Sequence, residues 1–252
     1  MGYAFAGFLV GFLNASLGIG GGVLLVPILA YVLHMEFKKA IGTSLATIVP
    51  TSLVAVITHY LIKSSNLTVI PVITILFGSL IGAWIGSKLV VKLSSALLKF
   101  LFSMLLIFAG LKLIGVFSLS NVPPILKINP YLSLVGLFAG ISSVLLGIGG
   151  GVIIVPSLNI FFGFSMHQAV TTSLAVIFPT TLMGALLHKR LQNIEGRIIK
   201  YILPSAAIGA VAGAFFSNTL PSSTLRIIFG SFLILISMRI LLESIRSRLL
   251  NL

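Results

Sequence analysis

Hydrophobic residues fill most of the chain in eight long runs, which short polar stretches separate. Six runs are close to the roughly 20 apolar residues that a membrane-spanning helix needs, and the other two are more than 30 residues long. This pattern predicts an all-α integral membrane protein. The runs cover residues 3–33, 40–62, 67–90, 96–117, 131–163, 168–188, 198–218 and 223–245.

Both of the longest runs contain the sequence Leu-Gly-Ile-Gly-Gly-Gly-Val near their middle. The copies span Leu17–Val23 and Leu146–Val152, 129 residues apart, and each precedes a proline, Pro27 or Pro156. A glycine cluster interrupts a helix, and each remaining half, about 15 residues, is short for a full crossing. We therefore predict a broken, re-entrant first segment in each half of the chain, with Pro27 and Pro156 as structural helix breaks.

The duplication extends well beyond the glycines and indicates two homologous four-segment repeats. We predict a first transmembrane repeat over residues 1–117, a linker over 118–130 and a second transmembrane repeat over 131–252. Further matches at the same offset pair Gly7 with Gly136, Gly11 with Gly140, Thr43–Ala46 with Thr172–Ala175, Pro50 with Pro179, Thr51 with Thr180, and His59 with His188.

Composition supports the membrane class and excludes some chemistry. Charged residues make up only 8% of the 252 residues, against about 25% in soluble domains. The absence of cysteine excludes disulfides, thiolate metal sites and cysteine nucleophiles. Sixteen Lys and Arg against three acids give a net charge of +13, which we expect to contact membrane lipids rather than nucleic acid, because no basic face is clustered. The first residues lack a basic region, so we expect a mature terminus rather than a cleaved signal.

Lys and Arg are distributed as a mirror image between the two halves. Eight simple crossings place at most 10 of the 16 on one side. If the two glycine-broken segments enter and leave on the same side, 12 of the 16 lie inside, as basic residues prefer. We therefore predict inverted repeats, six full spans and both termini in the cytoplasm. The four residues left outside are Lys63, Lys112, Lys127 and Arg226.

The glycine clusters are the main candidate for a binding site. Non-helical backbone at membrane depth survives only against protein or a watery cavity, and a helix that restarts there offers free N–H groups to an anion. Paired broken helices of this kind mark the midplane site of many transporters built from repeats. The alternative interpretation is close packing of helices. The candidate substrate-binding glycines are Gly18, Gly20, Gly21 and Gly22, with Gly147, Gly149, Gly150 and Gly151.

Hydroxyl side chains form a second candidate set. Thr43 and Ser44 recur as Thr172 and Ser173, and such groups can coordinate an anion or a cation without carrying charge. They can equally bond to their own helix or a neighbour. Asn14, with Ser143 at the equivalent position, is a weaker candidate.

Acid–base and metal chemistry have little support in this sequence. There is no Asp and no Glu deep in a predicted span, so we expect no catalytic residues, no metal and no cofactor. His59 and His188 end equivalent helices, where capping or an interface position is the simpler interpretation than a pH-sensitive gate.

The two motifs GIGGGVLLVP and GIGGGVIIVP, followed by GTSLA and TTSLA, resemble the sulfite exporter TauE/SafE family, also described as the toluene-sulfonate uptake permease family. The resemblance covers nearly the whole chain. It implies a multi-pass transporter in the cytoplasmic membrane of a prokaryote, carrying sulfite, related sulfur oxyanions or organosulfonates. By that likeness the glycines, Pro27, Thr43, Ser44 and their counterparts frame the pathway.

Together these observations predict a secondary transporter of small anions that works by alternating access around a midplane site, with a homo-oligomer as one form open to it. A carrier of another small metabolite or of a cation is the alternative within transport. An intramembrane enzyme such as a lipid phosphatase would need converging nucleophile and acid–base residues, which the sequence does not offer.

Overall fold

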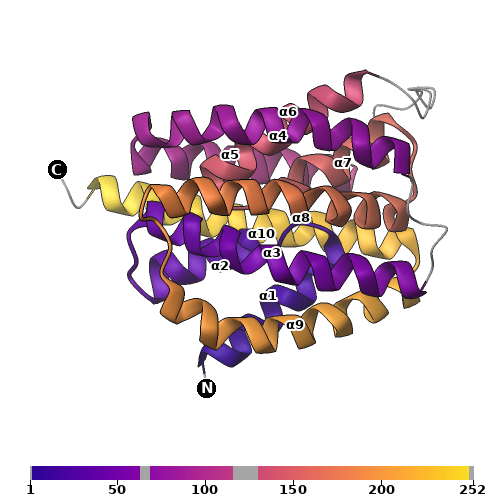
Figure 1. The fold of residues 1–252 in the computed structure, drawn as a ribbon, viewed down its shortest axis with the longest axis horizontal. Helices are drawn as coiled ribbons and strands as arrows, with labels where there is room; N and C mark the ends of the chain where they lie inside the picture. Colours follow the sequence, from indigo (N-terminus) through magenta and orange to yellow (C-terminus); the bar gives the residue numbers. More distant parts are fainter. Residues whose placement is uncertain (1, 63–68, 116–129, 250–252) are drawn as a thin grey trace.

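The computed structural model describes residues 2–62, 69–115 and 130–249. Within these ranges the regular elements are all helical, which confirms the predicted all-α class, and most run along the long axis of the molecule (Figure 1). The elements are α1 (Gly2–Leu17), α2 (Gly22–Pro27), the π-helical turn η1 (Ile28–Val32), α3 (Phe37–Ile62), α4 (Val69–Lys92), α5 (Ser95–Ile114), α6 (Tyr131–Leu146), α7 (Gly151–Phe161), α8 (Met166–Arg190), α9 (Gly196–Thr219) and α10 (Ser222–Leu249).

Four helices, α3, α4, α8 and α9, are long and apolar enough to cross a membrane. They coincide with four of the six predicted full spans. The other two predicted spans fall on α5 and α10, where many side chains lie outside the described residues. Apart from Pro130, the predicted linker 118–130 lies outside the described residues too, as do Lys63, Lys127 and the side chain of Lys112.

Each of the two longest hydrophobic runs forms two helical legs that fold back on each other. In the first run, Ile28 and Leu33 at the end of the second leg line the same cavity as Tyr3 and Leu9 of α1. In the second run, Phe138 of α6 and Phe161 of α7 line one cavity together. Both runs are therefore helical hairpins, and the reversal takes place at the glycine cluster.

The prolines are not where the helices break. Pro156 lies inside α7, and Pro27 is the last residue of α2, where the α-helix continues directly into η1. The assignment of Pro156 as a structural helix break is thus wrong, since α7 continues through it, whereas at Pro27 the α-helix changes to a π-helical turn without reversing the chain. The reversals lie before Gly22 and before Gly151. Proline is tolerated within membrane helices, whereas each break contains three glycines with positive φ, a conformation that other residues disfavour.

Glycine-lined faces join helices from opposite halves of the chain. A Cβ on Gly11 of α1 would overlap the carbonyl oxygen of Ala206 in α9, and one on Gly82 of α4 would overlap that of Leu137 in α6. Small residues allow such close approach of helices in membranes, where no hydrophobic force draws them together. The pairs α1–α9 and α4–α6 therefore connect the two halves.

The helices α3 and α8, which the predicted repeats make equivalent, run antiparallel to each other. In the pair α3–α8, Gly42 lies against Asn193, just beyond the end of α8, while Leu45 lies against Gly184 one turn further along. The pair α5–α10 crosses where Gly110 meets Gly230. Hence α3 and α8 occupy the centre of the molecule in opposite directions (Figure 1).

Candidate functional site

The two glycine breaks meet at the centre of the molecule, main chain against main chain. A Cβ placed on Gly20 would lie 3.1 Å from the Cα of Gly149, and a Cβ placed on Gly149 would lie 3.1 Å from the Cα of Gly20. A Cβ on Gly151 would overlap the carbonyl oxygen of Gly18, and one on Gly22 would overlap that of Gly147. The structure thus brings the predicted glycines together, and they pack tightly in the conformation it describes.

Backbone geometry explains why these positions are glycine. In the first break Gly18, Gly20 and Gly21 have φ values of 66°, 87° and 69°, in the left-handed region that favours glycine. Their counterparts Gly147, Gly149 and Gly150 have φ values of 71°, 81° and 89°. The two breaks therefore have nearly the same conformation, and each is fixed by three consecutive or near-consecutive glycines.

The carbonyl groups exposed by each break receive hydrogen bonds from the other half of the chain. Ser44 Oγ donates to the Gly147 carbonyl at 2.9 Å, and Ser173 Oγ donates to the Gly18 carbonyl at 2.8 Å. Both serines are fully buried. They reach the glycine breaks, as expected, but their protons are directed at main-chain oxygens.

Two buried histidines satisfy further carbonyl groups at the ends of the first legs. His59 Nε2 donates to Ala15 O at 2.8 Å, and His188 Nε2 donates to Val144 O at 3.0 Å. Because a carbonyl oxygen only accepts, Nε2 carries the proton in each ring. The last carbonyls of a helix have no partner within it, so these contacts fit the capping role expected for the histidines.

The other ring nitrogen of each histidine accepts from an asparagine that the sequence did not single out. Asn218 Nδ2 of α9 lies 3.1 Å from His59 Nδ1, and Asn193 Nδ2 lies 3.4 Å from His188 Nδ1. One asparagine belongs to a helix and the other to the loop after α8. Since the two occupy unrelated positions in the chain, the repeat gave no signal for them.

The threonines beside the two serines are Thr43 and Thr172. Thr43 Oγ1 accepts from the backbone N–H of Glu195 at 3.0 Å, so it holds the residue that precedes α9. Thr172 is fully buried in α8. Thr43 therefore connects α3 to the loop between α8 and α9 in addition to any contact with a substrate.

The second helical leg of each hairpin starts with backbone N–H groups that no side chain caps. Gly21 and Gly150 occupy the N-cap positions of α2 and α7, and neither start has a side-chain cap. The first N–H groups of a helix have no acceptor within it and carry the positive end of its dipole. In the described part of the chain no group of three His, Cys, Asp or Glu residues is placed to hold a metal ion. The starts of both second legs therefore present backbone N–H groups without a side-chain cap.

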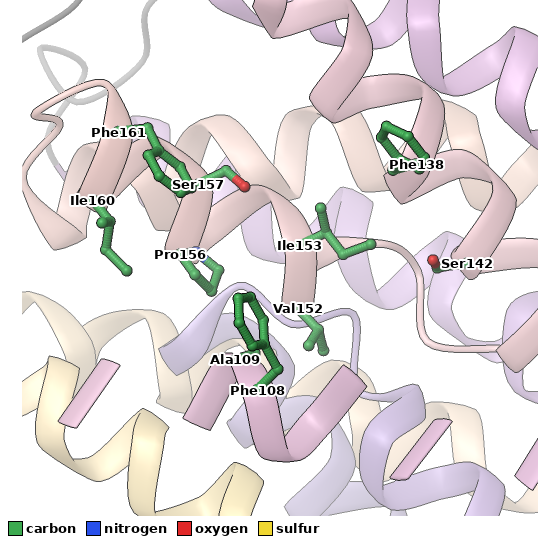
Figure 2. Close-up of a pocket in the computed structure, with 10 residues that line it drawn as sticks. All are labelled: Phe108, Ala109, Phe138, Ser142, Val152, Ile153, Pro156, Ser157, Ile160 and Phe161. Carbon is green, nitrogen blue, oxygen red and sulfur yellow. The ribbon is translucent and has the colours of Figure 1, made fainter. Parts of the chain in front are cut away.

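Two cavities lie within the hairpins, and both are mainly apolar. The cavity between α5, α6 and α7 has a volume of about 330 Å³, and Ser142 and Ser157 are its polar side chains (Figure 2). The cavity between α1, η1 and α9 has a volume of about 440 Å³. Such linings suit an apolar group, so neither cavity by itself explains how an anion is bound.

Comparison with known proteins agrees with these features. The family model described as "Sulfite exporter TauE/SafE" matches residues 1–113 and 132–250. A probable membrane transporter protein of Methanocaldococcus jannaschii is 35% identical over 215 residues, which cover 81% of this chain and 79% of that protein. The probable membrane transporter proteins YdhB and YunE of Bacillus subtilis are 28% and 26% identical, covering 87% and 96% of this chain and 91% and 97% of their own. No solved structure matches the chain. The chain belongs to the sulfite exporter TauE/SafE family, whose curated members here are described as probable membrane transporters.

Proposed function

We propose that this protein is a secondary transporter of small anions, with sulfite, related sulfur oxyanions or organosulfonates as substrates. The observation that carries the proposal is the meeting of two helix starts without side-chain caps beside the contact of Gly20 and Gly149. Beside this contact the carbonyls of Gly147 and Gly18 accept from Ser44 and Ser173. Charge at the breaks is therefore biased towards N–H donors, which bind anions.

We further propose that the two halves are inverted repeats that rock against each other. Three features support this. Equivalent helices α3 and α8 run antiparallel, equivalent residues make equivalent contacts, and the glycine-broken runs fold back as hairpins. Because the breaks contact each other, rocking of one half would separate Gly20 from Gly149 and open space between the helix starts. Alternating access around a midplane site follows from such a motion.

The proposed location is the cytoplasmic membrane of a prokaryote, with the basic ends of the helices inside. The relatives described above come from an archaeon and a bacterium. The start of α3, the end of α4 and the loop from α8 to α9 lie at the same end of the molecule, on the left in Figure 1. These segments carry Lys39, Lys92 and Arg190 among others, as the preference of basic residues for cytoplasmic loops requires.

Flux measurements in proteoliposomes test the function. We expect saturable uptake of sulfite that methanesulfonate inhibits, and no uptake of potassium or sodium in the absence of an anion substrate. Gly150→Ala places a Cβ 2.9 Å from Ala139 O at a strained φ, and we expect it to reduce flux. Gly184→Ala, whose Cβ meets mainly the ends of Val144 and Leu45 side chains, is the matched control. Absence of saturable flux for every anion tested would refute the proposal.

A further inference from the structure

Two buried oxygen atoms at equivalent positions have no hydrogen-bond partner among the residues that the structure describes. They are Oδ1 of Asn14 and Oγ of Ser143, which lie 129 residues apart in side chains with no exposed surface. Most buried polar atoms in proteins are hydrogen-bonded, and an unpaired one is destabilising. Both halves keep such an atom at the same place, where a bound ligand would supply the missing partner.

The orientation of the Asn14 amide follows from its neighbour Thr51. Thr51 Oγ1 lies 3.1 Å from both Thr47 O and Ile48 O, and these carbonyls only accept, so the hydroxyl proton is directed at them. The hydroxyl oxygen must then accept from the amide, which it does from Asn14 Nδ2 at 3.3 Å. The unpartnered atom of Asn14 is consequently a carbonyl oxygen, which accepts and cannot donate.

Asn14 lies beside the glycine break. Its Cβ would be 3.3 Å from a Cβ on Gly21, the residue from which the second leg, Gly22–Val32, starts without a side-chain cap. The residue that carries the unpartnered oxygen thus lies beside a helix start, whose first N–H groups have no acceptor within the helix. An anion there can accept from the N–H groups, but an anion without a proton of its own would face the lone pairs of Asn14 Oδ1.

The corresponding place in the second half has different chemistry. Thr180 Oγ1 pairs with Ser79 Oγ at 2.7 Å, so a serine of α4 takes the position that the Asn14 amide takes against Thr51. The free group is then the hydroxyl of Ser143, which can both donate and accept. This half accepts a ligand with or without a donor.

We propose that Asn14 is a specificity-determining contact that selects small anions carrying their own hydrogen-bond donor, such as a protonated or hydroxyl-bearing sulfur oxyanion. Ser143 is its less selective counterpart. This inference rests on the proposed anion transport and adds to it a chemical requirement on the substrate. A substrate donor to Asn14 Oδ1 satisfies the unpaired oxygen, whereas the aprotic analogue leaves it unpaired. Sites built to bond a substrate hydroxyl reject the analogue that lacks it.

Two monoanions of nearly equal size provide the test. Hydroxymethanesulfonate carries a hydroxyl donor and methanesulfonate does not. Binding to the purified full chain and counterflow in proteoliposomes are measured for both. We expect the wild type to prefer hydroxymethanesulfonate by about tenfold, the value of one hydrogen bond to a buried group. Asn14→Ser should bring the ratio of affinities towards one, and Ser143→Asn should raise it further.

Ser52→Ala is the control, because the buried Ser52 hydroxyl bonds only to Val49 of its own helix, and its ratio should equal that of the wild type. Equal affinities of the wild type for the two anions, with flux intact, would overturn this inference alone and would mean that a trapped water satisfies Asn14. Absence of binding and flux for both anions would overturn the proposed function as well. Should Asn14→Ser not fold, the wild-type ratio and Ser143→Asn decide the question.

Discussion

The hydroxyl of Ser44 donates to the carbonyl oxygen of Gly147 across the boundary between the two halves of the chain, at 2.9 Å. The reciprocal bond joins Ser173 to Gly18 at 2.8 Å. Each half therefore satisfies the broken backbone of the other. Because of these reciprocal bonds, each break depends on the other half of the chain for its stability. The serine hydroxyls bond to main-chain carbonyls, whereas the proposed contacts with substrate are N–H groups that follow the glycines.

Removing either serine hydroxyl should destabilise the protein. In Ser44→Ala the Gly147 carbonyl loses its side-chain donor in a buried place, at a cost of about 1–3 kcal/mol, and Ser173→Ala should cost the same. The two losses should not be additive, because the bonds meet at one contact. Thermal unfolding in detergent measures both, with Ser52→Ala as the neutral comparison. A normal melting temperature combined with lost flux would instead assign the serines to substrate binding.

Alanine at the centre of the break should prevent folding. Gly20 has a φ of 87°, and a Cβ there would overlap Ile148 O, which is backbone and cannot move aside. We therefore expect Gly20→Ala to abolish a monodisperse peak in size-exclusion chromatography. Gly149→Ala, whose Cβ would lie 3.1 Å from the Gly20 Cα at a φ of 81°, should lower the melting temperature. Gly196→Ala, at the start of α9, meets nothing within 4 Å and should behave as the wild type. Normal folding of both central variants would contradict the described contact.

His59 and Asn218 should be energetically coupled. Asn218 holds the ring through Nδ1 while Nε2 donates to Ala15 O, so the asparagine favours the tautomer that caps α1. A double-mutant cycle with His59→Phe and Asn218→Leu should give a coupling of about 0.5–3 kcal/mol in unfolding free energy. The same cycle with Asn159, which bonds to Phe164 O instead, should show no coupling to His59.

The sequence predicted the breaks well because their cause is local. Three positions in each break have a positive φ, which glycine adopts without strain, and the duplicated motif marked both breaks. The hydrogen-bond partners of the breaks were only partly predictable. Ser44 bonds to Gly147 because the two halves pack together, and residue spacing within one half does not reveal that contact. The role of Pro156 was misjudged because α7 continues through the proline, as membrane helices do where neighbouring groups satisfy the freed backbone. Asn193 and Asn218 were not predicted, because they bond to equivalent histidines from positions that the repeat does not relate.

The membrane topology can be tested with single cysteines, because the chain contains none of its own. Lys39 at the start of α3 and Arg190 at the end of α8 are both exposed, as is Ser223 near the start of α10. With six full spans and two re-entrant hairpins, Lys39→Cys and Arg190→Cys react with an impermeant maleimide from the cytoplasmic side, and Ser223→Cys reacts from the other. Eight simple crossings predict a different grouping, with Lys39→Cys and Ser223→Cys on one side and Arg190→Cys opposite. The two arrangements therefore differ in which variant is labelled from the same side of the membrane as Lys39→Cys. Labelling of Lys39→Cys and Ser223→Cys from one side would exclude the inverted repeats.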